Sequence, residues 1–309
     1  MELRQLQHFL AVLETGSFHG AADQTGLTQQ AISRSIKKLE QELGVTVLER
    51  KARTRHKVTA TASGRILIPR AQVMLAEAAA FQNEIKDYQG TGSNIVRVGA
   101  TPAEARTLVP RIISAFTDKY PETRVQVIID QGQKVLENIS SGVHDLAICS
   151  EPRGGITHGY KAEKIVKNQS IFVARSGHPL AKKSRLKIED LATFGWVSAG
   201  LFEHTIFEFI RIFNDAQLKH PFHALETTST ELAIKSIEDN DYVALMPTLL
   251  AHDSILSGSL CRLKMSRHVS DTWSSMMVSR SHSPLNQMTA AFRDTAREIS
   301  LNFDAEAAM

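Results

Sequence analysis

Three short helical patterns, each followed by a glycine, occupy residues 3–44 and constrain how this part of the chain can fold. Apolar residues recur three and four positions apart from Leu3 to Leu13, which predicts an amphipathic helix that ends at Gly16. A second, shorter helix ends near Gly26. The turn Thr25-Gly26-Leu27 joins it to a third helix, and two helices joined by such a tight turn form the helix-turn-helix pattern.

The third helix combines one apolar stripe with one polar face. Ile32, Ile36, Leu39 and Leu43 recur at four, three and four residues and predict the buried stripe. Side chains on the polar face can read base edges in a DNA major groove or hold phosphates. We expect base contacts from Gln29, Ser33 and Arg34, with Gln30 as a fourth, and phosphate contacts from Lys37 and Lys38. Thr28, the expected N-cap of this helix, completes the expected DNA-binding residues. The alternative for such residues is a solvated helix face.

The segment after the third helix favours a DNA partner. Val45, Val47 and Leu48 predict a short strand, and residues 49–59 predict a basic hairpin that lies along the phosphate backbone as a wing. The phosphate contacts that we expect from this wing are Arg50, Arg53, Arg55 and Lys57. Residues 1–70 hold eleven Lys or Arg against six Asp or Glu, a net charge of +5, whereas the remainder of the chain carries −2. Only the N-terminal part is therefore expected to meet a polyanion.

Residues 62–90 carry one long helical pattern with a heptad repeat. Its apolar residues alternate at four and three positions: Leu67, Ala71, Met74, Ala78, Phe81, Ile85 and Tyr88. Such a repeat indicates a coiled-coil contact between two chains, although a helix packed on its own domain is the alternative. We favour a dimer through Leu67, Met74, Phe81 and Ile85, because a helix-turn-helix gains affinity from two half-sites. The following Gly90-Thr91-Gly92-Ser93 predicts a hinge.

Strand and helix patterns alternate after the hinge, which predicts an α/β fold with parallel sheets covered by helices. Ligands of such sheets lie beyond the carboxyl ends of the strands. The residues at or just after these ends are the expected effector site: Thr101, Pro102, Ala103, Gln131, Ser150, Ser198, Phe202 and Thr228. Several of them lead into helices whose free amides can bind an anion, so we expect a small ligand such as a carboxylate. The absence of an Arg at these ends leaves a neutral or aromatic ligand open, and simple helix capping is the alternative role of the hydroxyls.

Other functions find little support in the sequence. No catalytic Ser elbow, phosphate loop or zinc motif is present, so we expect neither an enzyme nor a cofactor or metal site. No apolar run approaches the roughly 18 residues that cross a membrane. The N-terminus has no secretory pattern, which predicts a cytoplasmic protein and excludes an exported solute-binding protein. Cys149 and Cys261 fit a reducing compartment, and a redox pair between them stays open.

Short motifs that are characteristic of one family extend over nearly the whole chain and are most specific within residues 1–50. They are Leu6-Gln7-His8-Phe9, Gly16-Ser17-Phe18, Ala21-Ala22, Leu27-Thr28-Gln29, Ala31-Ile32-Ser33-Arg34, Ile36-Lys37-Lys38-Leu39-Glu40, Leu43-Gly44-Val45, Glu49-Arg50, residues 116–121, Ser176-Gly177-His178-Pro179-Leu180-Ala181 and Ala244-Leu245-Met246-Pro247. In these motifs the chain resembles the LysR-type transcriptional regulators. It departs from the family at Gln30, where a Pro is usual, and in a wing that is a few residues longer.

The resemblance implies an all-α winged helix-turn-helix domain over residues 1–61 and a dimerisation helix over 62–90. It implies a periplasmic-binding-protein-like effector domain over 91–309, with lobe one at about 93–164 and 270–303 and lobe two at about 165–269. Two crossing strands would join the lobes. The partners that it implies are double-stranded promoter DNA, a small-molecule effector and other copies of the chain in a homodimer or homotetramer.

Overall fold

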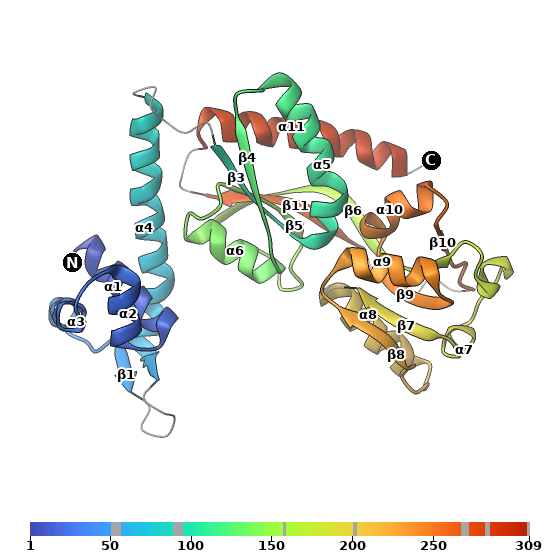
Figure 1. Cartoon of the computed structure of the whole chain (residues 1–309), viewed down its shortest axis with the longest axis horizontal. Helices are drawn as coiled ribbons and strands as arrows, with labels where there is room; N and C mark the ends of the chain where they lie inside the picture. The colour runs from blue at the N-terminus through green and yellow to red at the C-terminus, as the bar shows by residue number, and fades with distance from the viewer. Residues whose placement is uncertain are drawn as a thin grey trace. The chain divides into compact units, whose positions relative to one another are not determined.

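The computed structural model describes residues 1–50, 57–88, 95–156, 159–199, 203–266, 272–281 and 285–307 (Figure 1). The chain divides into two compact units. The first comprises Met1–Ser93 with Ser140–Val143, and the second comprises Asn94–Ile139 with His144–Met309. Of the helices described, none is long and apolar enough to cross a membrane.

The first unit begins with the three predicted helices, α1 (Leu3–Thr15), α2 (Phe18–Thr25) and α3 (Gln29–Leu43). Each ends at a glycine with a positive φ, at Gly16, Gly26 and Gly44, a conformation that favours glycine because it has no Cβ. The Thr28 hydroxyl accepts a hydrogen bond from the Ala31 N–H at 3.2 Å and caps α3, as its position predicted. The helix-turn-helix expected from the sequence is confirmed.

The first strand of the hairpin that follows begins later than predicted. Strand β1 (Leu48–Arg50) pairs antiparallel with β2 (Val58–Ala60), and Val47 and Val58 enter the core with Phe9, Ile32 and Leu39. Val45 does not belong to the strand and is exposed, and Leu43 is exposed at the end of the predicted stripe. Both corrections have one cause, since the chain turns at Gly44 and carries these two side chains away from the core.

Helix α4 (Ala62–Tyr88) is the long helix of the heptad repeat. Its first turns pack on the first unit's own core, where Ala71 is buried and Leu67 is partly buried. For Leu67 the alternative contact, with its own domain, is therefore the observed one. Met74, Phe81 and Ile85 are exposed.

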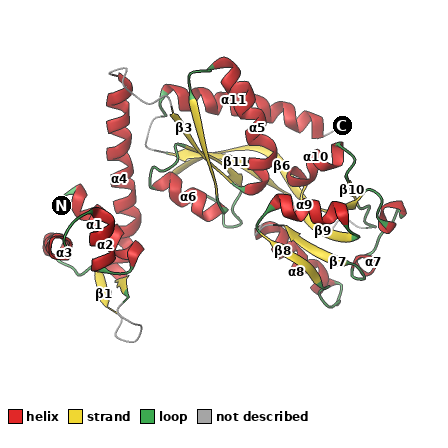
Figure 2. Cartoon of the chain, in the orientation of Figure 1, coloured by secondary structure: helices red, strands yellow, loops and turns green. Residues whose placement is uncertain are grey.

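The second unit is built on a large mixed sheet. Strands β3 (Ile95–Ala100), β4 (Arg124–Ile129) and β5 (Leu146–Ser150) are parallel, and β11 (Thr272–Arg280) lies antiparallel between β5 and β6 (Tyr160–Arg175). Helices α5 (Pro102–Lys119) and α11 (Gln287–Ala307) pack on one face, and α6 (Gly132–Ser140) packs on the other (Figure 2).

The long strand β6 continues the sheet through the rest of the unit. It pairs antiparallel with β9 (Tyr242–Pro247) and with β10 (Leu260–Arg262). Across the sheet, β7 (Gly195–Ala199) lies next to β9 and β8 (His223–Thr227) lies next to β7, and these neighbours are parallel. A 3-10 turn at Pro179–Lys182 and four helices complete this part: α7 (Ile188–Leu191), α8 (Glu203–Asp215), α9 (Thr230–Asp239) and α10 (Thr248–Leu256).

The expected parallel pairing holds for β3 with β4 and β5 and for β7 with β8 and β9, but β6 and β11 pair antiparallel with their neighbours. The apolar run at residues 171–174, predicted as one strand, is the end of the 16-residue β6, and β11 pairs antiparallel with β6 along nine residues. Parallel strands are connected by helices, so an alternation of strand and helix patterns in the sequence predicts them. Strands β6 and β11 connect the two parts of the sheet and pair antiparallel, so this alternation does not predict them.

Candidate functional site

Helix α3 presents the predicted polar face to solvent. Its exposed side chains are Thr28, Gln29, Gln30, Ser33, Arg34, Lys37 and Lys38. Lys38 differs from the others because its Nζ lies 2.6 Å from Glu2 Oε1, and this hydrogen bond and charge lower the pKa of Glu2. The lysine is therefore already paired with α1's N-terminal flank, and it is a weaker candidate for a phosphate contact than Lys37.

A buried histidine, which the sequence did not single out, connects α1 to α3. His8 Nδ1 lies 2.7 Å from Ser35 Oγ. Burial, and to a smaller degree the positive charge of Arg4, lower the pKa of His8. This contact joins α1 to α3 at Ser35, which lies between the buried stripe and the exposed face of α3.

The wing is only partly described. Arg53 and Arg55 fall outside the described residues, as does the side chain of Arg50. Lys57 is exposed at the start of β2, where the Val58 N–H donates to the Gly16 carbonyl oxygen at 2.8 Å. This bond holds the wing against the end of α1.

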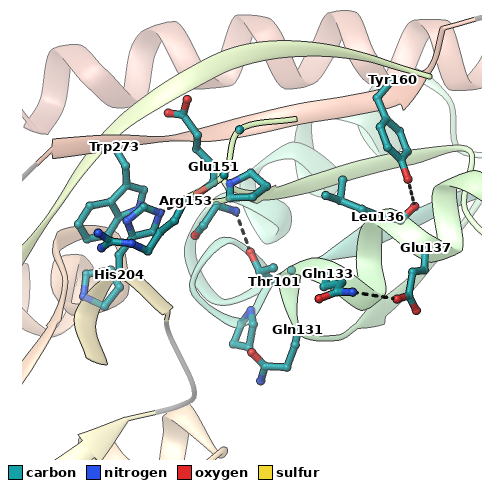
Figure 3. Close-up of a pocket in the computed structure, with 17 residues that line it drawn as sticks. Thr101, Gln131, Gln133, Leu136, Glu137, Glu151, Arg153, Tyr160, His204 and Trp273 are labelled. Carbon is teal, nitrogen blue, oxygen red and sulfur yellow. Dashed lines mark hydrogen bonds between the residues drawn. The ribbon is translucent and has the colours of Figure 1, made fainter. Parts of the chain in front are cut away.

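A cavity of about 590 Å³ lies in the second unit at the carboxyl ends of β3, β4 and β5 (Figure 3). Four of the predicted effector residues line it, namely Thr101, Pro102, Gln131 and Ser150. Ala103 is fully buried and does not line it, because the first turn of α5 directs its side chain into the core. Gly132 and Gln133, at the start of α6, complete one wall.

A buried carboxyl group lies behind this wall. Glu104 is fully buried and accepts hydrogen bonds from Ser150 Oγ at 2.9 Å and Ser275 Oγ at 2.7 Å; its other oxygen contacts Thr101 Oγ1. Burial raises the pKa of Glu104, and the three hydroxyls act in the opposite direction. The spacing Thr101-x-x-Glu104 is that of a capping box, a signal that could have drawn attention to Glu104. The Thr101 side chain makes no capping bond, however, and meets the carboxyl group instead.

Two aromatic contacts complete the other side of the cavity. His204, in the first turn of α8, stacks on Trp273 of β11, and both residues line the cavity. The guanidinium of Arg153 lies over the Phe207 ring at 3.6 Å from its centroid. Sequence patterns did not single out His204, Phe207 and Trp273 for the site, because α8 and β11 are distant in sequence from the strand ends that they face.

The remaining predicted residues do not share this cavity. Ser198 and Thr228 line a second cavity of about 800 Å³, between α8 and strands β7 and β8, together with Phe209 and His223. Phe202 lies outside the described residues. The residues expected to form one effector site therefore line two cavities, because the carboxyl ends of β3 and β5 open into one cavity and those of β7 and β8 into another.

The two cysteines and the potential metal ligands were considered for thiol reactivity and for metal binding. Cys149 is buried, and burial raises its pKa to about 12, so its thiol is protonated and unreactive. Burial also raises the pKa of the partly buried Cys261. Within the described ranges, no group of three or more His, Cys, Asp or Glu side chains is placed to hold a metal ion.

Comparisons with known proteins identify both parts of the chain. Residues 3–65 match the family described as bacterial regulatory helix-turn-helix protein, lysR family, and residues 89–300 match the LysR substrate binding domain. The chain is 32% identical over 195 residues to the SDS degradation transcriptional activation protein of Pseudomonas sp. (strain ATCC 19151), covering 62% of this chain and 63% of that protein. It is 28% identical over 260 residues to the HTH-type transcriptional regulator GbpR of Azospirillum brasilense, covering 84% and 75%.

Among solved structures, ArgP from Mycobacterium tuberculosis superposes with a TM-score of 0.66 at 18% identity, covering 96% of each chain. At this identity the likeness concerns the fold. The alignments span between 63% and 75% of the length of the two relatives described above. Both relatives are regulators of transcription.

Proposed function

Because the chain belongs to the LysR family of transcriptional regulators, we propose that it binds promoter DNA through α3 and the wing and responds to a small molecule bound in the 590 Å³ cavity. One observation carries the proposal. A single chain combines an exposed polar face on α3 with a cavity lined by Thr101 and Ser150 at the strand ends of a second unit.

On the DNA side, Gln29, Ser33 and Arg34 contact bases, with Gln30 as a fourth reader. They lie in the first half of α3, the half that enters the major groove in proteins of this architecture. Lys37 holds phosphate together with the wing residues Arg50, Arg53, Arg55 and Lys57, and Lys38 contributes when it leaves Glu2.

On the effector side, Thr101, Pro102, Gln131 and Ser150 form the binding surface. A pocket that is mostly apolar with a few converging polar groups is typical of small-molecule sites, and Leu136 and Trp273 supply apolar area here. The sequence suggested a carboxylate as the ligand.

The working assembly is a dimer through Met74, Phe81 and Ile85 of α4, and two such dimers form the homotetramer. Apolar side chains exposed along one line of a helix are typical of such a contact. Because its partner is promoter DNA, the protein acts in the cytoplasm. We retain residues 1–61, 62–90 and 91–309 as the DNA-binding, dimerisation and effector-binding parts, with the two lobes bounded as the sequence suggested.

The experiment that tests this function has two stages. Binding sites are first selected from random duplex DNA with the full chain, and metabolites are then screened for compounds that raise its melting temperature and change its affinity for the selected site. Failure to enrich any sequence would contradict the DNA-binding half. For a compound that binds, Thr101→Val and Ser198→Ala tell the two cavities apart. We expect Thr101→Val to weaken binding and Ser198→Ala to leave it unchanged, and the reverse result moves the effector to the second cavity.

A further inference from the structure

A third cavity, of about 440 Å³, lies in the second unit and is lined by residues of β5, β6, β11 and α11. We propose that this α11 cavity is a further ligand site, which binds a small organic carboxylate. Among the described residues, it shares no lining residue with the 590 Å³ cavity. The α11 cavity is therefore a site in addition to the proposed effector site, whichever molecule binds there.

Neighbouring strands place a cation and a carboxylate in the wall of the α11 cavity. Lys161 and Glu163 of β6 are two positions apart, so their side chains leave the sheet on the same face. In the antiparallel register, Ser279 of β11 lies opposite Lys161, and Met277 lies opposite Glu163. Residues directly opposite each other share a face, and all four of these line the cavity.

Helix α11 adds two arginines to this wall. Arg293 and Arg297 are four positions apart, so they are neighbours on the helix surface, and both line the cavity. Arg297 Nε and Nη2 donate to the two oxygens of Glu163, each at 2.7 Å. Asp294 Oδ1 accepts from Arg293 Nε at 2.9 Å and from Arg297 Nη1 at 3.0 Å. These bonds hold both guanidinium groups beside the cavity.

Positive charge exceeds negative charge around the α11 cavity even when both carboxylates of the cluster are counted. Arg293 and Arg297 balance Glu163 and Asp294, and the charge of Lys161 is left over, because this lysine makes no ion pair within the described ranges. Donors are also left over, since Arg297 uses three of its five N–H groups in the bonds above. The cavity wall therefore offers a positive charge and N–H donors to a ligand.

Glu163 shows that a carboxylate is stabilised at this place. The hydrogen bond from Arg297 lowers the pKa of Glu163, and the charges of Arg297, Arg293 and Lys161 lower it further, against the opposing effect of burial. A guanidinium presents its N–H groups in a fork that matches the two oxygens of a carboxylate. A carboxylate ligand in the cavity would meet the same cations as the side chain of Glu163 does.

The surroundings of these cations favour a small molecule over the backbone of DNA. Leu146 and Met277 line the cavity and are buried, so part of its wall is apolar. A concave site with apolar walls and a few converging polar groups is typical of small-molecule sites. The carbon skeleton of an organic carboxylate has a place to pack here, which a phosphate of a duplex would not use.

The test uses three probes of nearly the same shape on the full-length chain: succinate, succinamate and succinamide, which carry two, one and no negative charges at neutral pH. Isothermal titration calorimetry at constant ionic strength gives each dissociation constant. We expect affinity to fall in that order, by at least about twofold for each charge removed. Equal affinities for the three probes, or no binding of succinate, would overturn the proposal.

Two variants of β6 should change the affinity for succinate in opposite directions. Lys161→Gln removes a charge without breaking an ion pair and should weaken binding about two- to fivefold. Glu163→Gln removes the competing carboxylate and frees N–H groups of Arg297, so it should strengthen binding by a similar factor, a gain that a damaged fold could not produce. The matched control is Lys119→Gln, because Lys119 pairs with Glu298 of the same helix α11 and does not line the cavity. It should leave the affinity unchanged.

The remaining outcomes decide between this cavity and other places for the anion. Unchanged affinity for succinate in both Lys161→Gln and Glu163→Gln would mean that the anion binds elsewhere, and the proposal would fall. The proposal would also fall if Lys161→Gln left succinate binding intact and weakened binding to every DNA duplex, since Lys161 would then serve a phosphate contact.

Discussion

The imidazole of His204 lies flat on the indole of Trp273, with ring centroids 4.5 Å apart and an angle of 2° between the ring planes. His204 Nε2 also donates to the Glu151 carbonyl oxygen at 2.6 Å. His204 belongs to α8, whereas Trp273 belongs to β11 and Glu151 follows β5. One side chain therefore ties α8 to two strands on the far side of the cavity, and its loss should loosen that wall.

Replacing His204 by Leu should lower the free energy of unfolding of the second unit by about 1–2 kcal/mol. A neutral hydrogen bond contributes about 1 kcal/mol and an aromatic pair about 0.5–1.5 kcal/mol. Both tryptophans of the chain, Trp196 and Trp273, lie in this unit, so their fluorescence during urea unfolding follows it alone. Lys219→Leu, at an exposed position of the same unit, is the control. Equal midpoints for the two variants would mean that the stack contributes nothing.

Arg34→Ala should weaken binding to a selected DNA site by about 1–3 kcal/mol and relax the base preference at one position, because Arg34 is a base reader in our proposal. Fluorescence anisotropy with the selected site and with a scrambled duplex measures both effects. Arg4→Ala removes the same charge from an exposed position of α1 and should preserve the preference. If Arg34→Ala binds both duplexes as the unmodified protein does, Arg34 does not read bases.

Lys57→Ala should weaken binding to every duplex to a similar extent, since a phosphate contact carries no sequence information. The slope of log K against log salt concentration should become less steep by about one. Lys182→Ala, in the second unit, is the control for a general change of charge. An unchanged slope for Lys57→Ala would remove the wing's start from the DNA interface.

Phe81→Glu should break the dimer, because Phe81 is 62% exposed in the single chain and would place a charge in the proposed contact between two α4 helices. Val73→Glu changes an exposed apolar residue on another side of the same helix and should leave the assembly intact. Sedimentation velocity distinguishes the species. An unaltered oligomer of Phe81→Glu would show that this line of α4 is not the contact.

Sequence patterns that act within a few residues predicted more of this structure than patterns that would have to relate distant parts of the chain. The glycines after α1, α2 and α3 and the cap at Thr28 act within a few residues, so their pattern predicted the helix-turn-helix and its exposed face. The strand ends at Thr101 and Ser150 were predicted for the same reason.

What sequence patterns could not predict depends on residues far apart in the chain. Ser275 meets Glu104 across 171 positions, and Trp273 meets His204 only after β11 returns to the sheet. The separation of Ser198 from Thr101 follows from β6, which carries the chain out of one set of parallel strands and into the next. The sequence alternates between strand and helix patterns in the same way in both sets of parallel strands, so this pattern could not show that the two sets open into separate cavities.

The pH dependence of stability should reveal a buried histidine in the second unit. His178 is fully buried, its Nδ1 accepts the Leu180 N–H at 3.0 Å, and its ring lies 4.5 Å from that of Phe194. Burial lowers the pKa of His178; the backbone and charge of Asp241 raise it and Arg175 lowers it, both to a smaller degree. The folded protein therefore holds the neutral form at pH values where the unfolded chain, with a pKa of about 6.5, binds a proton.

The sign follows from this difference in bound protons. The contribution of neutral His178 to the free energy of unfolding is fully present above about pH 6.5. It falls as the pH drops from there toward the lowered pKa of the folded protein, by at most about 1.4 kcal/mol per pH unit. His178→Asn keeps an acceptor suited to an N-cap and removes the titrating group, so the loss of stability between pH 7.5 and 5.5 should be smaller. Phe194→Leu should lower stability at both pH values and retain the full loss between them. Urea unfolding followed by tryptophan fluorescence measures each value, and an equal loss in His178→Asn and the unmodified protein would assign the acid sensitivity to another group.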